Sequence, residues 1–318
     1  MSVPPSVSVL VTTYRHANFV REALDSLRNQ TFQDFETIIT DDASPDGTAD
    51  VIQDWLDETG FPAHFIRNPK NRGICANRNT AVALASGRYI CSLSGDDAYL
   101  PDRLARQVVQ FDTLGEEFAA LYSDAALMDA ESHDLGRSYI EQYFGHVAPP
   151  EDVFAQILCH ENFLPAPAVM IRRSALVAVG LYDESLFYED FDMWLRLAHR
   201  FRFAYLPGIV MRYRMLSDSL SHGVATKPGM LDTEFRILAR WLPQCPQFSA
   251  AISEQMWQVA SRQILLGHDD LGRHSMAEIA RTSPHLRRRL LARSVTLSGS
   301  GAIFRTVAAI DNWVRRPN

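Results

Sequence analysis

Four segments with the composition of β-strands alternate with four segments of helical periodicity in the first third of the chain. Each strand-like run of β-branched, aromatic and apolar residues leads through a polar turn into a stretch with apolar residues at helical spacing. The expected strands cover residues 7–12, 35–40, 64–66 and 88–91, and the expected helices cover residues 18–29, 49–56, 74–85 and 102–114. This alternation predicts an α/β fold with a mostly parallel sheet, wound by helices on both faces.

Polar residues follow three of the expected strands. In chain order they are Thr12 with Tyr14, then Asp42, and then the adjacent pair Asp96 and Asp97. Ligands of wound sheets bind beyond the carboxyl ends of the strands, so these clusters are expected to converge on one crevice and to form a nucleotide pocket. Two neighbouring carboxylates there favour a hard cation that takes oxygen ligands, Mg²⁺ or Mn²⁺. The alternative for the pair is capping of the helix that follows.

Other nucleotide-binding proteins carry motifs that this chain lacks. A dinucleotide dehydrogenase needs GxGxxG after the first strand, where residues 12–17 read TTYRHA, and no Walker loop occurs. A net charge of −7 argues against nucleic acid as a partner, because phosphate backbones are bound mostly by clustered lysine and arginine. Four cysteines without paired spacing, and no apolar run near the ~18 residues that span a bilayer, predict a cytoplasmic protein with reduced thiols.

A set of short segments is specific enough to indicate a family. In chain order they read VSVLVTTY (7–14), QTFQDFE (30–36), DDAS (41–44), DGT (46–48), NRG (71–73), ASGRYI (85–90), DD (96–97), LPDRL (100–104), ED (189–190) and WLR (194–196). Over about residues 7 to 222 the chain resembles a family 2 glycosyltransferase with the GT-A fold, which has a Rossmann-like wound sheet. Many members carry Asp-x-Asp-Asp at the metal site, and here the first position is Ser94. Members with Thr-Asp-Asp there are similar to this chain, so metal dependence is expected.

The resemblance implies a donor site in the crevice. Thr12 and Tyr14 would line the base pocket, with Tyr14 stacking on uracil or another base, and Asp42 would accept a hydrogen bond from the base edge. Arg72 would meet the diphosphate or the ribose, and Arg78 is either a second such contact or a solvated helical side chain. The alternatives are a partly buried aromatic residue for Tyr14 and a turn or helix cap for Asp42.

The resemblance also implies the chemistry. Asp96 and Asp97 would hold Mn²⁺ or Mg²⁺, with Asp96 also contacting the donor nucleotide. Asp190, beside Glu189, would be the general base that takes the proton of the acceptor hydroxyl. The reaction implied is an inverting transfer from a nucleotide diphosphate sugar, UDP-sugar first, to a saccharide or lipid-linked saccharide in bacterial-type polysaccharide or glycoconjugate synthesis. The alternative for Glu189 and Asp190 is capping of the helix that they begin.

Several residues complete the expected site region. Trp194 has the spacing of a buried helix position and counts as a secondary residue on the acceptor side. His222 is a substitute for the third metal ligand, because family members often carry a histidine where Leu216 stands here. The i,i+4 spacing of Asp192 and Arg196 predicts a surface ion pair.

The later part of the chain has a different sequence pattern. Residues 119–124 and 126–129 are predicted to form two short strands, and residues 133–150 are predicted to be rich in loops. Beyond residue 225 only helices are expected, at 231–242, 250–266, 271–281 and 286–294. This divides the chain into a catalytic domain, 1–225, and a helical C-terminal region, 226–318. Arginines 287–289, 293, 305, 315 and 316 form either a solvated face or a peripheral docking surface for anionic lipid at the inner face of the membrane.

Two other functional classes stay open at this level. A nucleotidyltransferase shares the wound sheet, but it would need a glycine-rich arginine loop after the first strand, and that loop is missing. A non-catalytic sugar-nucleotide-binding module of a polysaccharide assembly complex would be expected to have lost Asp190 or the metal pair, and both are present.

Overall fold

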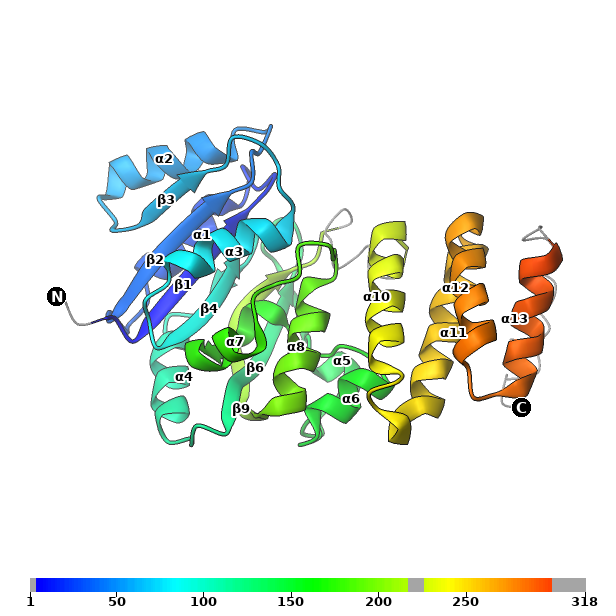
Figure 1. Cartoon of the computed structure of the whole chain (residues 1–318). Coiled ribbons are helices and arrows are strands. Elements are labelled where there is room, and N and C mark those ends of the chain that lie inside the picture. The colour runs from blue at the N-terminus through cyan, green and yellow to red at the C-terminus, as the bar shows by residue number, and fades with distance from the viewer. Residues whose placement is uncertain (1–3, 217–225, 299–318) are drawn as a thin grey trace. The chain divides into compact units, whose positions relative to one another are not determined.

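Strands β1 to β4 of the computed structural model are parallel and lie in the order β3-β2-β1-β4 (Figure 1). They are β1 Val7–Thr13, β2 Phe35–Asp41, β3 His64–Arg67 and β4 Tyr89–Ser94. Thr12 of β1 lies opposite Ser94 of β4, and Thr13 lies opposite Asp41 of β2, so the three strands end at one level. The strand order reverses between β1 and β4, which is where wound sheets bind ligands. The predicted parallel arrangement is confirmed.

The structure describes residues 4–216 and 226–298, and the chain divides into two compact units. The first unit contains residues 1–154, 163–185 and 192–217, and the second contains residues 155–162, 186–191 and 218–318. Two short segments from the first two thirds of the chain therefore cluster with the C-terminal helices.

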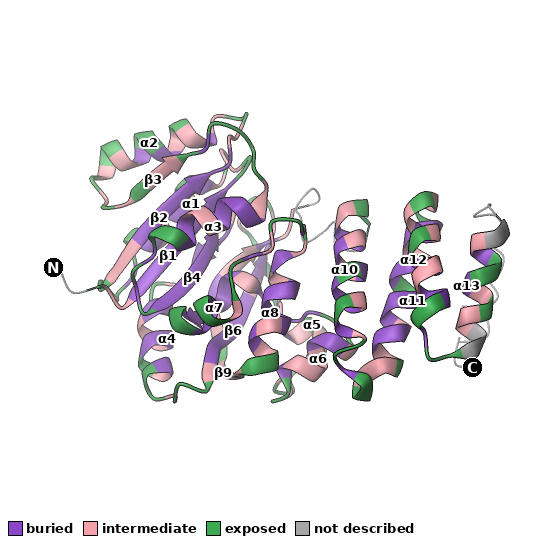
Figure 2. Cartoon of the chain, in the orientation of Figure 1, coloured by how far each residue is buried: buried purple, intermediate pink, exposed green. Residues whose placement is uncertain are grey.

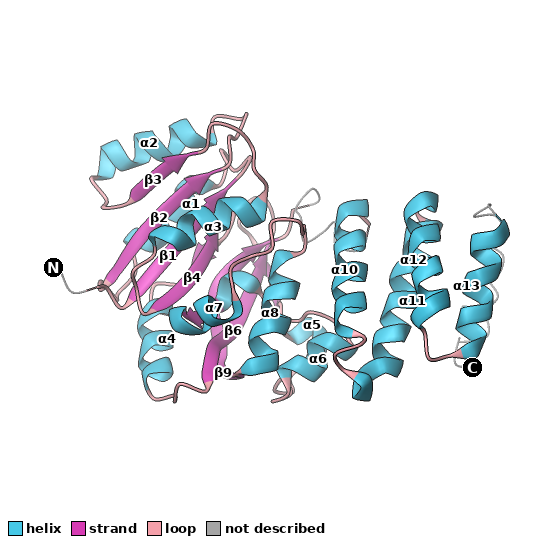
Figure 3. Cartoon of the chain, in the orientation of Figure 1, coloured by secondary structure: helices cyan, strands magenta, loops and turns pink. Residues whose placement is uncertain are grey.

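A helix follows each of the first three strands directly, as predicted, and the fourth helix follows β4 after the two-residue strand β5 Ala98–Tyr99 (Figure 3). The helices are α1 Val20–Arg28, α2 Thr48–Thr59, α3 Ile74–Leu84 and α4 Arg103–Asp112. Helix α1 buries Val20, Ala23, Leu24 and Leu27, which are spaced i, i+3, i+4 and i+7 and so share one face. Gly47 and Gly60 flank α2 with φ of 87° and 63°, a conformation that glycine adopts without strain.

Beyond β4 the sheet contains strands of both directions, in the order β4-β8-β6-β9-β5. The strands are β5 Ala98–Tyr99, β6 Phe118–Met128, β7 Asp134–Ser138, β8 Val169–Arg172 and β9 Arg202–Arg214. β8 is antiparallel to both β4 and β6, whereas β6 and β9 are parallel, and β7 pairs with β6. The sheet is therefore mixed, and its parallel part carries the crevice.

Strand β6 is a single strand where two short strands were predicted. Ser123 and Asp124, at the end of the first of these predicted strands, are buried inside the single strand. Asp124 accepts hydrogen bonds from the backbone N–H of Ile140 at 2.8 Å and from the hydroxyl of Ser138 at 2.6 Å. A returning segment thus satisfies the carboxylate, and the disturbance is limited to shifts in the pairing of β6 with β9 around Asp124.

The remaining α-helices of this part of the chain are α5 Glu141–Phe144, α6 Val153–Cys159, α7 Arg173–Val179 and α8 Glu189–Arg200, and residues Ala166–Ala168 form a short 3-10 helix. The stretch 133–150, predicted to be mostly loop, contains β7 and the short helix α5.

The central strands are buried along most of their length (Figure 2). Every residue of β1 is buried, as expected for a strand covered on both faces. Its one early polar residue, Ser8, donates a hydrogen bond to Glu36 at 2.5 Å and accepts one from the backbone N–H of Gly87 at 2.8 Å. The buried hydroxyl is therefore satisfied, and it ties β1 to the turn before β4.

The second unit contains the C-terminal helices, which each pack against the next in the chain. They are α10 Pro228–Trp241, α11 Ser249–Leu265, α12 Asp269–Thr282 and α13 Leu286–Ser298. Glutamates on two helices meet arginines from later helices, Glu234 with Arg262 and Glu254 with Arg288. Within residues 4–216 and 226–298, none of the helices combines the length and the apolar character that crossing a membrane requires.

Candidate functional site

The turn after β1 is tied to the turn after β2 through its backbone. Three consecutive N–H groups donate to side chains of the second turn, as the pairs Arg15–Ser44 at 3.0 Å, His16–Thr48 at 2.8 Å and Ala17–Asp46 at 3.1 Å. Arg15 and Ala43 adopt positive φ, 62° and 56°, a conformation that side chains other than glycine hold only under local constraint. The DDAS and DGT segments therefore shape the mouth of the crevice.

Asp41 is a structural residue of this mouth. Its Oδ1 accepts hydrogen bonds from the hydroxyls of Thr13, at 2.9 Å, and Ser44, at 2.5 Å. Its Oδ2 accepts from the backbone N–H of Ser44 at 2.9 Å. The carboxylate is buried and faces protein donors from the neighbouring strand and turn.

Asp42 is also buried, and it organises the turn after β3. Its Oδ1 accepts from the backbone N–H of Arg72 at 2.9 Å and from Nδ2 of Asn68 at 3.1 Å, while its Oδ2 accepts from the backbone N–H of Gly73 at 2.9 Å. A carboxylate offers about four acceptor positions, so these three bonds leave capacity for one more donor.

Two asparagines support Asp42, and the sequence reasoning missed both. Asn77, on α3, accepts a hydrogen bond from Nδ2 of Asn68 at 3.0 Å and donates to the backbone oxygen of Thr40 at 3.2 Å. Both amides are buried. The role of Asn77 could have been predicted from its position on the buried face of a helix, because a buried polar side chain needs a hydrogen-bond partner.

The other expected donor-site residues lie around these turns. Tyr14 is 39% exposed, with the Arg15 guanidinium carbon 5.4 Å from its ring centroid, so the residue is accessible at the mouth of the crevice. Thr12 is buried at the end of β1, and its backbone oxygen accepts from the N–H of Gly95 at 3.2 Å. The Arg72 side chain is exposed and donates to the Thr80 hydroxyl at 3.3 Å.

Arg78 is buried, so it is not a solvated helical side chain. Its guanidinium carbon lies 5.2 Å from the ring centroid of Tyr182. This cation–π contact holds the middle of α3 against a segment that precedes α8.

Asp96 and Asp97 follow β4, and their carboxylates have different surroundings. Asp97 is 3% exposed, and its Oδ1 accepts the backbone N–H of Arg214 at 2.9 Å. Burial, and after it the neighbouring charge of Asp96, raise the pKa of Asp97 well above its ordinary value. The Asp96 side chain is 12% exposed, and its Oδ1 lies 3.8 Å from Nε2 of His16. Asp96 is thus the more accessible of the two carboxylates.

The capping alternative for this pair does not hold in the part of the chain that the structure describes. Helix α4 has Asp102 at its N-cap position, and no side chain caps it. The pair is therefore free of that role.

Gly95 permits the close packing of the turn that carries Asp96. A Cβ atom at this position would lie 2.6 Å from Nδ1 of His16 and 2.7 Å from Cγ2 of Thr13. His16 Nδ1 is itself buried and has no hydrogen-bond partner among the described residues. Only glycine fits between the turn after β1 and the turn after β4 without a shift of one of them.

Glu189 and Asp190 begin helix α8 and belong to the second unit, whereas Asp42, Asp96 and Asp97 belong to the first. Oδ2 of Asp190 accepts from Nδ2 of Asn162 at 3.4 Å, and its Oδ1 accepts from the backbone N–H of Phe191 at 2.8 Å. Glu189 is buried and Asp190 is half-buried. Within the second unit, Asp190 is the more accessible carboxylate at the start of the helix.

The prediction that Asp192 and Arg196 pair at the surface is wrong, because the pair forms but is buried. The two residues do pair, at 2.7 Å, but the Asp192 side chain is 1% exposed. Arg196 also donates to the backbone oxygens of Val179, Gly180 and Leu181, so the pair anchors the end of α7. Buried charges require such additional hydrogen bonds.

The last two residues of the predicted set are Trp194 and His222. Trp194 is 2% exposed and packs edge-on against Phe203 at 6.3 Å between ring centroids, which makes it a core residue of α8. His222 lies outside the described residues.

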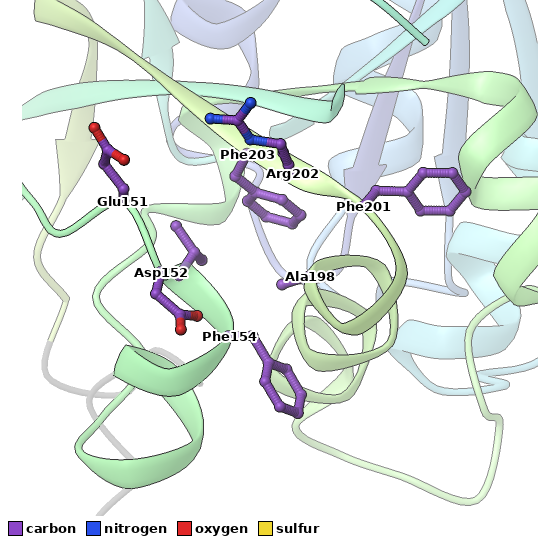
Figure 4. A pocket seen from close by; sticks show the side chains of 8 residues that line it. Glu151, Asp152, Phe154, Ala198, Phe201, Arg202 and Phe203 are labelled. Atoms are coloured by element: carbon purple, nitrogen blue, oxygen red, sulfur yellow. The ribbon is translucent and has the colours of Figure 1, made fainter. Parts of the chain in front are cut away.

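A cavity of about 300 Å³ in the first unit lies elsewhere (Figure 4). Its lining comes from residues 151–154, the end of α8 and the start of β9, including Phe154, Ala198, Arg202 and Phe203. The first residue of β9 lies opposite Phe118, the first residue of β6. Strand β8 pairs with both β6 and β4, and this pairing places the start of β6 level with the start of β4. The cavity is therefore at the amino edge of the sheet, opposite to the crevice.

A second acidic group follows β6. One ligand atom each from Asp129, Glu131 and His133 lie within 4.8 Å of one another. Oδ1 of Asp129 accepts the backbone N–H groups of the other two residues, at 3.0 and 2.8 Å, so hydrogen bonds within the turn account for this arrangement.

The mixed, wound sheet and the helices that accompany it define an α/β protein of the GT-A fold. The chain belongs to glycosyl transferase family 2, whose model matches residues 8–177. This confirms the resemblance seen in the sequence and the GT-A fold class.

Relatives and solved structures agree with this family. An uncharacterized glycosyltransferase of Rickettsia typhi is 27% identical over 74% of this chain and 70% of its own length. TuaG of Bacillus subtilis, whose name assigns it to teichuronic acid biosynthesis, is 27% identical over 68% of this chain and 82% of its own length.

Among solved structures, S. aureus TarS 1-349 in complex with UDP has a TM-score of 0.68 at 16% identity, covering 96% of this chain and 91% of that one. A mannosyltransferase from Pyrobaculum calidifontis, in complex with GDP-Man and Mn²⁺, has a TM-score of 0.58 at 16% identity, covering 99% and 89%. At this identity they show a shared fold.

Proposed function

We propose that the protein is an inverting, metal-dependent glycosyltransferase that moves a sugar from a UDP-sugar to an acceptor hydroxyl. The observation that carries this proposal is the partly exposed Asp96 carboxylate on the turn after β4, beside the switch point of a family 2 glycosyltransferase sheet. The fold neighbour TarS was solved in complex with UDP and with UDP-GlcNAc, which supports a uridine donor.

The base of the donor binds at the mouth formed by the first two turns. Tyr14, which is exposed, stacks on the base, and Thr12 lines the pocket at the end of β1. Asp42 uses its remaining acceptor position for the imide N–H of the base, a donor that distinguishes uracil from bases without it. Arg72 is exposed on the turn that Asp42 holds, in position for the ribose or the diphosphate.

The residues of the turn after β4 fit a divalent cation, Mn²⁺ or Mg²⁺. Asp96 offers an accessible carboxylate oxygen, the ligand type that both ions prefer, and Asp97 is the second candidate ligand beside it. When bound there, the cation would offset the negative charge that develops on the departing nucleoside diphosphate.

On the acceptor side, Asp190 takes the proton of the attacking hydroxyl, held by Asn162 and by the first turn of α8. One displacement with one base inverts the anomeric centre. Glu189, which is buried at the start of α8, supports this position, and Trp194 is a buried core residue of the same helix.

The acceptor is a saccharide or a lipid-linked saccharide in polysaccharide or glycoconjugate synthesis at the cytoplasmic face of a membrane. The name of TuaG supports a polysaccharide setting. Peripheral contact would use basic side chains of α13 that remain at the surface, such as Arg293, since Arg288 pairs with Glu254.

The test is a panel of nucleotide sugars with and without Mn²⁺. Thermal stabilisation identifies the donor, and release of UDP with a candidate acceptor or with water reports transfer. Release of pyrophosphate from a nucleoside triphosphate and a sugar phosphate would instead indicate a nucleotidyltransferase. Stabilisation by a nucleotide sugar without release of UDP under any condition would indicate a binding module.

A further inference from the structure

Arg214, the last residue of β9, donates hydrogen bonds to both Asp96 and Asp97. Its backbone N–H donates to Oδ1 of Asp97 at 2.9 Å, and its side-chain Nε donates to the backbone oxygen of Asp96 at 2.7 Å. The residue is 2% exposed, which makes it one of the largest fully buried side chains of the first unit. A single buried arginine thus holds the turn after β4 by two different groups.

The rest of the Arg214 guanidinium is anchored away from that turn. Nη1 donates to the backbone oxygens of Asp129, at 2.9 Å, and Ala130, at 3.0 Å, and to the hydroxyl of Ser132, at 2.9 Å. Nη2 donates to Oε2 of Glu22 on α1 at 2.5 Å. The Phe19 ring covers the guanidinium, with its centroid 4.8 Å from Cζ.

These contacts make the Asp96–Asp97 turn dependent on a distant scaffold. The Arg214 side chain connects this turn to the turn after β6 and to α1. If the Asp96–Asp97 turn shifted, those two elements would have to shift with it. Glu22 supplies the charge that balances the buried guanidinium and also accepts from the Ser132 hydroxyl at 2.7 Å. Such a support is what a metal-binding carboxylate needs in order to keep one orientation.

We propose that the Arg214 side chain is a positioning residue, which fixes the direction of the Asp96 carboxylate for the cation that accompanies the donor diphosphate. The inference rests on the proposed function in so far as Asp96 is taken to bind that cation. Arg214 acts through the backbone of Asp96 and is not itself a ligand.

Arg212 provides a matched control two residues earlier on the same strand. It also pairs with Glu22, with Nη1 2.9 Å from Oε1, and it also donates to the backbone oxygen of Ser132. Its strand partner is Ala98, and neither of its side-chain bonds reaches Asp96 or Asp97. Replacing Arg212 with glutamine breaks an ion pair with the same Glu22 and a hydrogen bond to Ser132, but it leaves the proposed link to Asp96 intact.

The experiment compares the full-length wild type with Arg214→Lys and Arg212→Gln, with UDP and Mn²⁺ as probes. Free Mn²⁺ is followed by electron paramagnetic resonance in the presence of UDP, and UDP affinity without metal is measured by calorimetry. Loss of an outer-shell support typically costs about 10–100-fold in metal affinity, and we expect that loss for Arg214→Lys. Metal-free UDP affinity should stay within about twofold, and Arg212→Gln should bind Mn²⁺ like the wild type within about threefold.

Three results would overturn the inference. Unchanged Mn²⁺ affinity in Arg214→Lys, or an equal loss in both variants, would show that the link to Asp96 has no role in metal binding. A wild type that binds UDP equally well with and without Mn²⁺ would remove the proposed cation site itself, and the inference with it. Should circular dichroism show that Arg214→Lys is unfolded, Glu22→Gln replaces it, because that change removes the counter-charge of the guanidinium and should weaken Mn²⁺ binding in the same direction.

Discussion

Oδ2 of Asp42 accepts the backbone N–H of Gly73 at 2.9 Å, which ties the end of β2 to the turn that opens α3. The neighbouring N–H of Arg72 reaches Oδ1 of the same carboxylate at 2.9 Å. One buried side chain therefore shapes the third turn of the crevice while it faces the position proposed for the base. The roles of turn organiser and base reader are compatible, and they can be separated by experiment.

Asp42→Asn should affect both roles. The amide presents an N–H group to at least one backbone N–H donor, so the free energy of unfolding should fall by about 1–3 kcal/mol. UDP affinity should fall by about 10–100-fold, because a hydrogen bond to a charged acceptor is lost. Denaturant unfolding and calorimetry measure the two quantities. Asp41→Asn is the control, and it should lose stability but keep its UDP affinity; if both variants keep that affinity, Asp42 only organises the turn.

Gly95→Ala should destabilise the protein through a steric clash at the crevice. The added Cβ would approach Nδ1 of His16 and Cγ2 of Thr13 at distances that real contacts do not show, and overpacking of this kind costs about 1–3 kcal/mol. In the double variant His16→Ala with Gly95→Ala one of the two obstacles is gone. Its loss of unfolding free energy should therefore be smaller than the sum of the two single losses. Strictly additive losses would mean that the turn moves away as a whole.

Local sequence pattern was sufficient to predict the elements that build the crevice. The alternation of strands and helices depends on side-chain periodicity, which is a property of neighbouring residues. Because parallel strands end at one edge, the positions of Thr12, Asp42 and Asp96 along the chain were enough to predict that they share that edge. The register of β1, β2 and β4 places the ends of these strands at one level.

The support behind these residues could not be predicted from local pattern. Arg214 meets Asp96 across 118 positions and Glu22 across 192, and no local spacing encodes such pairs. For Asp192 and Arg196 the spacing predicted the ion pair but not its burial, which depends on backbone oxygens of residues 179–181. The burial of a side chain depends on which distant segments of the chain pack against it, and local spacing does not specify those segments.

Glu36 should make stability depend on pH at the acid end. Its carboxylate accepts from the Ser8 hydroxyl, and from the backbone N–H groups of Ser86, at 2.7 Å, and Gly87, at 3.2 Å. Burial alone would raise the pKa of Glu36, but these hydrogen bonds outweigh it and hold the pKa below the ordinary value of 4.5. The unfolded chain therefore binds the proton more readily, so this contribution is present above pH about 4.5 and is lost as the pH falls through the lower pKa of the folded state.

Glu36→Gln removes that titration. The free energy of unfolding of the variant should change less steeply between pH about 5 and 3 than that of the wild type, as measured by urea unfolding at each pH. Glu117→Gln, at an exposed glutamate, is the control and should keep the wild-type slope. If the free energy of unfolding of Glu36→Gln changed with pH as steeply as that of the wild type, the hydrogen bonds would not favour the charged form of Glu36.

Asp190→Asn separates a catalytic role from a structural one at the start of α8. Asparagine is nearly isosteric with aspartate and can still accept from the backbone N–H of Phe191, so folding and UDP affinity should stay close to wild type. It cannot take the proton of an acceptor hydroxyl, and turnover should fall by about 10²–10⁴-fold.

Asp192→Asn is the matched control on the same helix. Its carboxylate is buried against Arg196, so its replacement should lower the melting temperature, while turnover below that temperature is retained. Initial rates of UDP release, taken together with melting curves of both variants, test the pair. If Asp190→Asn kept near-normal turnover, or lost stability and activity together, Asp190 would only support the helix, and the base would have to be sought in Glu189.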